Sequence, residues 1–137
     1  MQKILLDSDI LIDFLHGIKK EPFAAFLSEK LFLSAVSYSE VLYGQKKVSK
    51  LGKVAKEVKI DKILEDLSID ILSFDQKVAA VFVDIKLSLE TRGEAIPDFD
   101  LIIAASAIVE DLELLTNNRK HFSRIDGLKL VDRNNLT

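Results

Sequence analysis

Short apolar runs alternate along the chain with longer segments in which apolar residues recur every three or four positions. The runs occupy residues 3–6, 31–36, 69–74, 112–116 and 128–131, and a polar or charged residue follows each of them. Brief apolar runs are typical of buried strands, whereas the longer spacing is typical of amphipathic helices. Strands that alternate with helices predict an α/β fold in which helices cover both faces of a mostly parallel, five-stranded sheet.

The segments between these runs carry the signals of helix ends. Helices are expected over 10–17, from 37 onward, over 48–67, from 75 to about 91 and over 98–111. Gly17 and Gly93 suit the left-handed position beyond a helix end. Asp75 is the expected N-cap of its helix. Ser37 and Glu40 have the spacing of a capping box, in which each side chain accepts a hydrogen bond from the other residue's backbone amide.

The composition is that of one domain, expected to span residues 1–137. Hydrophobic residues make up 48% of the chain and charged residues 30%, which argues against disorder. The chain has no cysteine, and this excludes a disulfide framework, a thiolate metal site and a cysteine nucleophile. The longest apolar run, near 101–109, falls short of the roughly 20 residues that a membrane-spanning helix needs. We therefore expect a soluble, cytoplasmic protein.

Charge is distributed unevenly along the chain. The net charge is −3, yet residues 46–62 contain seven lysines against two acids and so carry +5, which leaves −8 for the rest. This lysine-rich segment has two interpretations. It is either the solvated face of an amphipathic helix or a surface that contacts phosphates.

Acidic side chains stand where the predicted strands end or where the neighbouring helices begin. Asp7 follows the first run, and Glu40 lies early in the helix after the second. Asp98 and Asp100 open the helix that precedes the fourth. Ligands of parallel α/β folds bind beyond the carboxyl ends of the strands, so these groups are expected to meet. Each is also typical of a helix start, and Asp98 in particular is interpreted as an N-cap.

Converging carboxylates require a counter charge. Two of them about 5 Å apart repel by about 3 kcal/mol at an effective dielectric constant of about 20. A divalent cation removes this conflict, and oxygen ligands without cysteine or paired histidine favour Mg²⁺ or Mn²⁺ over zinc. A cation that keeps its waters can supply a nucleophile and polarise a phosphodiester.

Four stretches together resemble the PIN-domain ribonucleases, and most closely the VapC-type toxins of toxin–antitoxin pairs. They are "ILLDSDILIDFLHG" at the start, "LSAVSYSEVLYG" at 33–44, "IPDFDLIIAASAI" at 96–108 and "LLTNNRKHFSRIDGLKL" at 114–130. With the strand order they cover nearly the whole chain. The resemblance implies a PIN-like α/β/α sandwich.

The resemblance also implies the roles of individual residues. Asp7, Glu40 and Asp100 would be the metal-binding and catalytic acids, and Asp98 would be either a further ligand or the helix cap. Ser8 would steady the site by hydrogen bonding, while Asp9 replaces the usual asparagine and would add charge or cap the first helix. Supporting roles in the loop after the fourth strand would fall to Thr116, Asn117 and Asn118.

The chain departs from the family pattern in that same loop. Many relatives carry a fourth acid there, but residues 116–122 contain none, and His121 occupies the position where aspartate is frequent. An asparagine amide can orient a water but does not neutralise a cation. This departure makes catalysis with one metal ion the better expectation.

By the same resemblance the protein would be an endoribonuclease that hydrolyses RNA phosphodiesters with Mg²⁺, or with Mn²⁺ in its place. It would form a homodimer and be neutralised by a cognate antitoxin protein. Phosphate contacts are expected from three basic residues near the acidic edge: Arg119, Lys120 and Arg124. Contact with the antitoxin is one interpretation of four apolar residues, with core packing as the other: Leu11, Phe14, Tyr38 and Tyr43.

Other functions are compatible with parts of the sequence. A PIN-like domain that binds RNA or protein without cleaving it would also lack the fourth acid. A phosphoacceptor receiver domain would use Asp75 and Lys129, although the "IPDFDLIIAASA" stretch has no role in it. The Asp7-Ser8-Asp9 triplet is similar to the Asp-x-Asp of haloacid-dehalogenase-like phosphatases, but the later motifs of that family are not found.

Overall fold

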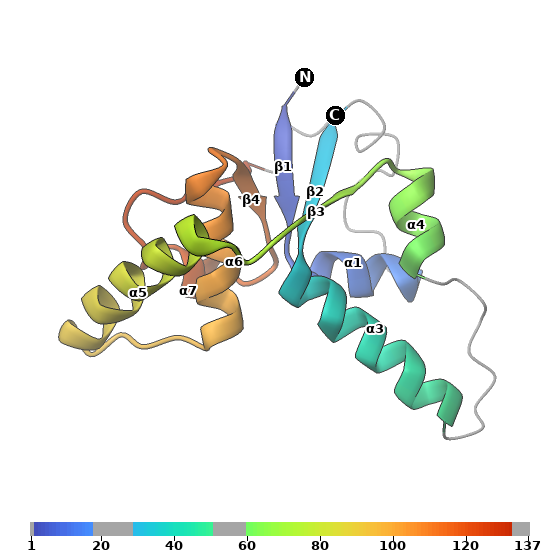
Figure 1. The fold of residues 1–137 in the computed structure, drawn as a ribbon, viewed down its shortest axis with the longest axis horizontal. Coiled ribbons are helices and arrows are strands. Elements are labelled where there is room, and N and C mark those ends of the chain that lie inside the picture. The colour runs from blue at the N-terminus through green and yellow to red at the C-terminus, as the bar shows by residue number, and fades with distance from the viewer. Residues whose placement is uncertain (1, 18–28, 51–59, 133–137) are drawn as a thin grey trace.

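The five predicted strands form one parallel sheet. The computed structural model of the protein describes residues 2–17, 29–50 and 60–132 (Figure 1). The strands lie in the order β3-β2-β1-β4-β5, and every neighbouring pair is parallel. They are β1 (Lys3–Leu6), β2 (Lys30–Ser34), β3 (Asp70–Leu72), β4 (Glu113–Leu115) and β5 (Lys129–Leu130). The expected α/β fold is confirmed, and most strands are shorter than the apolar runs that predicted them.

Helices cover both faces of this sheet. They are α1 (Ser8–Leu15), α3 (Ala35–Lys50), α4 (Ile60–Asp66), α5 (Gln76–Thr91), α6 (Asp98–Val109) and α7 (Arg119–Phe122). In Figure 1, α1, α3 and α4 lie to one side of the strands, and α5, α6 and α7 lie to the other. The architecture is therefore an α/β/α sandwich with a separate core on each face of the sheet.

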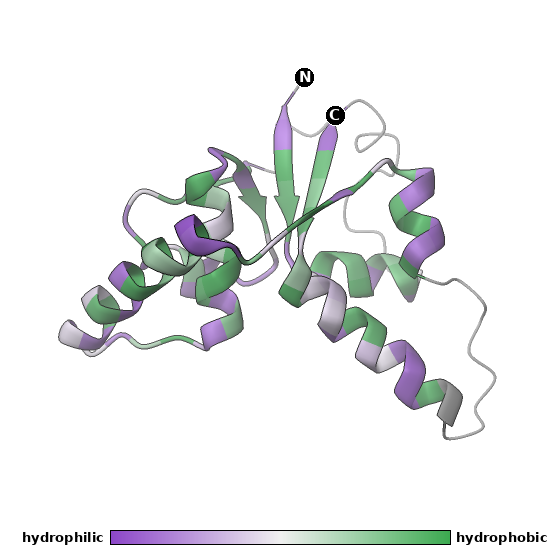
Figure 2. Cartoon of the chain, viewed as in Figure 1, coloured by the Kyte–Doolittle hydropathy of each residue, from purple (hydrophilic) through white to green (hydrophobic). Residues whose placement is uncertain are grey.

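The central strand contributes to both cores. Ile4 and Leu6 pack with residues of α1, α3 and α4, whereas Leu5 packs with residues of α5, α6 and α7. All three are buried, and burial of a side chain of this size contributes about 1.5–3 kcal/mol. A strand that is covered on both faces is apolar throughout rather than alternating, which is why 3–6 reads as one run. Figure 2 shows the apolar residues along the middle of β1 and β2.

The strand register brings distant parts of the chain to one edge. Leu6 of β1 lies opposite Leu33 of β2 and Leu115 of β4. Because the three strands are parallel, the residues that follow leave the sheet on the same side. This edge carries Asp7 and Thr116, and α3 begins just beyond it.

Helix α6 is an internal helix. Seven consecutive residues from Leu101 to Ala107 are buried, because the helix lies between the sheet and α5. The small residues of "AASA" permit close approach on both sides. The one buried hydroxyl among them, Ser106 Oγ, donates to the carbonyl oxygen of Ile102 at 2.9 Å. A helix that is buried on all sides has no polar face, which explains why the sequence of α6 is one long apolar run.

The predicted capping box at Ser37 and Glu40 is wrong. Helix α3 begins at Ala35, and the hydroxyl of Ser34 accepts a hydrogen bond from the Val36 amide at 3.3 Å. Ser37 therefore lies inside the helix, where its hydroxyl is buried without a hydrogen-bond partner among the described residues. Glu40 reaches another element instead, as described below.

The interpretation of Asp98 as an N-cap is also wrong. The N-cap of α6 is Pro97, whose φ is −59°, and the helix has no side-chain cap. Asp98 is the first residue within the helix and forms an ion pair with Lys86 of α5 at 3.0 Å. A carboxylate in the first turn still faces the positive end of the helix dipole, so the residue type is explained without a cap.

The helix predicted over 48–67 is present in part. Its beginning is the end of α3 and its later half contains α4. Residues 51–59, which include three of the seven lysines of the lysine-rich segment, lie outside the described residues. The structure therefore does not test whether that segment is a solvated face or a phosphate-binding surface.

Asp75 caps α5 as predicted, and Gly93 after this helix has a φ of +69°. Asp75 Oδ1 accepts from the Val78 amide at 3.0 Å. Replacing Asp75 by Ala is expected to lower the free energy of unfolding by about 1 kcal/mol, because that amide loses its acceptor. Urea denaturation measures the loss. Asp75→Asn keeps an acceptor and is expected to lose less than Asp75→Ala; equal losses would contradict the capping role.

Candidate active site

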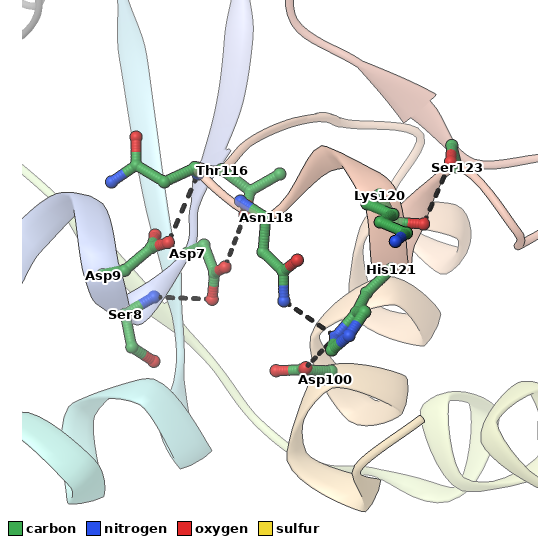
Figure 3. Close-up of polar contacts among 10 residues, drawn as sticks. Asp7, Ser8, Asp9, Asp100, Thr116, Asn118, Lys120, His121 and Ser123 are labelled. Carbon is green, nitrogen blue, oxygen red and sulfur yellow. Dashed lines mark hydrogen bonds and ion pairs between the residues drawn. The ribbon is translucent and has the colours of Figure 1, made fainter. Parts of the chain in front are cut away.

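Asp7 lies at the carboxyl end of the central strand and is the most enclosed acid of this edge. It is 6% exposed. Its Oδ1 accepts from the Ser8 amide at 2.8 Å, and its Oδ2 accepts from the Thr116 hydroxyl at 2.6 Å (Figure 3). The Asp7 amide donates to Leu115 O at 2.9 Å and so extends the pairing of β1 with β4. A buried carboxylate is thus held in one orientation from both sides.

Glu40 approaches the same edge from α3. The Ser8 hydroxyl donates to Glu40 Oε1 at 2.8 Å, which joins the first turn of α1 to α3. Ser8 therefore makes the kind of contact that the family resemblance implied. The Glu40 residue is exposed, in contrast to Asp7.

The loop after β4 is anchored on α1. Thr116 accepts a hydrogen bond from the Asn118 amide at 2.9 Å, in addition to donating to Asp7. The Asn117 amide donates to Asp9 Oδ2 at 3.3 Å, and the Asn117 side chain donates to Asp13 Oδ2 at 2.9 Å. Thr116 and Asn117, which were predicted to support the site, thus hydrogen-bond to acids at the end of β1 and in α1.

Asp100 reaches the site from the first turn of α6 and meets His121. The distance between Asp100 Oδ2 and His121 Nδ1 is 3.8 Å, and the Asn118 side-chain nitrogen lies 2.8 Å from the same ring nitrogen. Figure 3 shows these contacts joining α6 to α7. The sequence marked His121 as a departure from the family pattern, but it carried no signal that the ring meets Asp100.

The acids share one electrostatic field. Burial raises the pKa of Asp7. Hydrogen bonds from Thr116 and Ser8 lower this pKa, whereas the negative charges of Asp100 and Glu40 raise it further. Burial also raises the pKa of Asp100; His121 lowers it, and Glu40 raises it further. Burial and the charge of Asp7 raise the pKa of Asp9 to about 6. Four acids from three elements therefore repel one another at this edge.

The raised pKa of Asp9 predicts a pH-dependent stability in the absence of divalent cations. Its value of about 6 exceeds the ordinary 3.8, so the folded protein binds more protons than the unfolded chain between these values. This stabilisation is present below the ordinary pKa and is lost as the pH rises through about 6. Asp9→Asn removes the charge. In EDTA, the variant is expected to match the wild type near about pH 4 and to have the higher Tm near about pH 8.

Circular dichroism melts across this range measure the effect. A Tm difference between wild type and Asp9→Asn that stays constant with pH would contradict it.

The donor chemistry of the site fits a hard divalent cation. All the acids offer oxygen, and Asp9 Oδ1 is buried without a hydrogen-bond partner among the described residues. Their repulsion is the kind that a cation relieves. Within the described part of the chain, however, no three acidic or histidine side chains are already grouped as a formed metal centre. Binding a cation thus requires these side chains to draw closer together.

Other residues singled out in the sequence have different positions. Asp98 is exposed and paired with Lys86 rather than with the acids. Arg119 donates to the carbonyl oxygen of Val131 at 2.8 Å, whereas Lys120 is exposed beside His121. Of the apolar residues considered for antitoxin contact, Tyr43 is 67% exposed, while the others are buried or packed against the core: Leu11, Phe14 and Tyr38.

A receiver domain is contradicted by the sheet order. Asp75 follows β3 and Lys129 lies in β5, and these two strands are the opposite edges of the sheet. Asp75 caps α5, and Lys129 forms an ion pair with Asp111 at 2.9 Å. The two residues cannot share the phosphorylation site that this interpretation requires.

No helix among the described residues is both long and apolar enough to cross a membrane.

Comparison with known proteins identifies the family. The model of the PIN domain family matches residues 4–128. Ribonuclease VapC2 of Rickettsia felis is 32% identical, with 92% of this chain and 94% of the relative covered. The tRNA(fMet)-specific endonuclease VapC of Shigella flexneri is 30% identical, with 96% and 98% covered. The chain belongs to the PIN domain family.

Solved structures agree with this assignment. The DNA-bound VapBC structure from Salmonella typhimurium contains a chain that matches with a TM-score of 0.78 at 26% identity. The match covers 97% of this chain and 99% of that one. The family and fold implied by the sequence resemblance are therefore confirmed.

Proposed function

We propose that the protein is a metal-dependent endoribonuclease and the toxin of a toxin–antitoxin pair. The observation that carries the proposal is the buried Asp7 at the end of the central strand: burial raises its pKa, and the nearby charges of Asp100 and Glu40 raise it further. Two relatives that match 92% and 96% of this chain are named as a VapC ribonuclease and as a VapC endonuclease specific for tRNA(fMet), which supports RNA as the substrate class.

Asp7, Glu40 and Asp100 would together hold Mg²⁺, or Mn²⁺ in its place. When bound, such an ion would supply a Lewis acid and a water of lowered pKa. The hydrogen bonds from Ser8 and Thr116 hold Asp7 in a fixed orientation, and the second hydrogen bond of Ser8 orients Glu40. The reaction is the hydrolysis of an RNA phosphodiester.

Asp100 is better placed than Asp7 to accept a proton from the attacking water. Its side chain is 24% exposed, so it is reached by solvent and substrate, whereas Asp7 is enclosed. The His121 ring lies beside this carboxylate, with 3.8 Å between its Nδ1 and Asp100 Oδ2.

Contacts with RNA and with other proteins are part of the same proposal. Lys120, Arg119 and Arg124 would contact phosphates on the side of the site that α7 forms. A cognate antitoxin is proposed because structures of relatives are VapBC toxin–antitoxin complexes. Homodimer formation is proposed as well, and the mass of the purified protein in solution tests it.

The experiment is cleavage of a total small-RNA pool by the wild type and by Asp100→Asn, each with Mg²⁺, with Mn²⁺ or with EDTA. Discrete products are expected from the wild type with either metal. EDTA and the substitution are each expected to abolish them. Wild-type protein that binds RNA but leaves it intact with both metals would instead support a silent binding module.

A further inference from the structure

One carboxylate oxygen of Asp9 is buried and has no hydrogen-bond partner among the described residues. Asp9 lies in the first turn of α1, two residues after Asp7. Its Oδ2 accepts a hydrogen bond from the Asn117 amide at 3.3 Å, and the nearby Ile10 amide also favours the charged form of the carboxylate. The oxygen without a partner is Oδ1. A buried polar atom without a partner costs about 1–3 kcal/mol, so this oxygen calls for an explanation.

The charged groups that act on Asp9 are negative. Asp7 acts on it most strongly and Asp13 less so, while Asp9 in turn acts on Asp100. In Figure 3 its carboxylate lies beside that of Asp7, on the side of the loop after β4. Among the described residues, no lysine, arginine or histidine forms an ion pair with it.

A purely structural role does not account for the charge. Anchoring the Asn117 amide uses only Oδ2, and an asparagine at position 9 would accept the same hydrogen bond through its amide oxygen. The charge and the second oxygen would then serve no purpose, yet they add repulsion to a site that already contains Asp7. A role in binding a cation uses both.

We propose that Asp9 is a further metal-binding residue, with Oδ1 directed to the cation that Asp7, Glu40 and Asp100 would hold. The proposal rests on the metal dependence of the proposed function. It supplies from α1 a fourth negative charge, which residues 116–122 do not contain. Asn117 and Asn118 then position the acids by hydrogen bonds, and Asp9 contributes the charge.

The test is Mn²⁺ binding at about pH 7.5 by electron paramagnetic resonance and calorimetry. The proteins are the wild type, Asp9→Asn and Asp98→Asn. Asp9→Asn keeps the size of the side chain and an acceptor for Asn117, so it isolates the charge. Its Mn²⁺ affinity is expected to fall by at least about tenfold, the lower end of the loss for groups that support a metal site. Asp98→Asn removes a charge from the first turn of α6, where Asp98 is exposed and paired with Lys86, and is expected to stay close to the wild type.

The Tm of each protein, with and without Mn²⁺, gives a second readout that is independent of RNA cleavage. Mn²⁺ is expected to raise the Tm of the wild type and of Asp98→Asn more than that of Asp9→Asn. Should Asp9→Asn not fold, Asp9→Ser, which keeps a smaller acceptor, takes its place. Equal Mn²⁺ affinity of the wild type and Asp9→Asn would overturn the role of Asp9 but not the metal dependence of the proposed function. A wild type that binds no Mn²⁺ would overturn the metal dependence of the proposed function as well.

Discussion

Asp7→Asn is expected to reduce RNA cleavage about a thousandfold or more while the protein stays folded. The reason is that Asp7 would carry a full negative charge into the centre of the metal site. A metal ion contributes several kcal/mol to such a reaction, and about 4 kcal/mol corresponds to a thousandfold in rate. An initial-rate assay on a defined RNA substrate in Mg²⁺ measures the loss.

The same substitution is not expected to weaken the fold in EDTA. The asparagine side chain can accept from the Ser8 amide through its oxygen and donate to Thr116 through its nitrogen, so both present contacts have replacements. Removing the charge also removes the repulsion from Asp100 and Glu40 that raises the pKa of Asp7 in the folded protein. A Tm equal to or above that of the wild type, near about pH 8 in EDTA, would separate lost catalysis from lost structure.

Asp98→Asn is the matched control for this experiment. It removes a carboxylate from the same "PDFD" stretch that supplies Asp100, but Asp98 is exposed and paired with Lys86. Cleavage within about threefold of the wild type is expected, since surface ion pairs contribute about 0–1 kcal/mol. A loss as large as that of Asp7→Asn would show that Asp98 belongs to the site after all, and that its pairing with Lys86 changes when metal binds.

Local signals in the sequence were sufficient for the central strand and for α5. The run at 3–6 is apolar throughout because both faces of β1 are covered, and this pattern is legible without the structure. The start of α5 was equally legible, because Asp75 caps it through a contact only three residues away. Both predictions succeeded because the cause, whether burial on two faces or a cap, leaves its mark within a few neighbouring residues.

Helix starts that involve acids were ambiguous for a physical reason. The same carboxylate can accept amide protons, pair with a lysine or support a metal site, and its local sequence is similar in each case. Ser37 and Glu40 have capping spacing, yet Glu40 accepts from Ser8, which is 32 residues away. Asp98 resembles an N-cap in the sequence, but Pro97 occupies the N-cap position and Asp98 forms an ion pair with Lys86.

The contacts that shape the candidate site are the least local of all. Thr116 and Asp7 are 109 residues apart, and Asn117 and Asp9 are 108 apart. Only the parallel register of β1 with β4 brings them together. The resemblance to PIN-domain ribonucleases supplied this part of the prediction. It could not supply the contact of His121 with Asp100, because that contact arises where the chain departs from the family pattern.

Phe122→Ala is expected to lower the free energy of unfolding by about 3–5 kcal/mol, the usual range when a buried phenylalanine is truncated. Phe122 closes the short helix α7, is 0% exposed and packs in the core between the sheet, α5 and α6. Helix α7 has four residues, so its own hydrogen bonds hold it weakly and this side chain provides its main attachment.

The substitution should also disturb the site, because His121 immediately precedes Phe122. Movement of α7 would separate His121 from Asp100 and loosen Asn118, so cleavage by the protein that remains folded is expected to fall as well. Urea denaturation measures the stability, and Phe99→Ala is the control because Phe99 is 45% exposed and its truncation should cost about 0.5 kcal/mol or less. A loss below about 1 kcal/mol for Phe122→Ala would mean that α7 is held by its polar contacts rather than by its core residue. If Phe122→Ala loses the expected stability but its folded fraction cleaves RNA as fast as the wild type, His121 does not limit the position of Asp100.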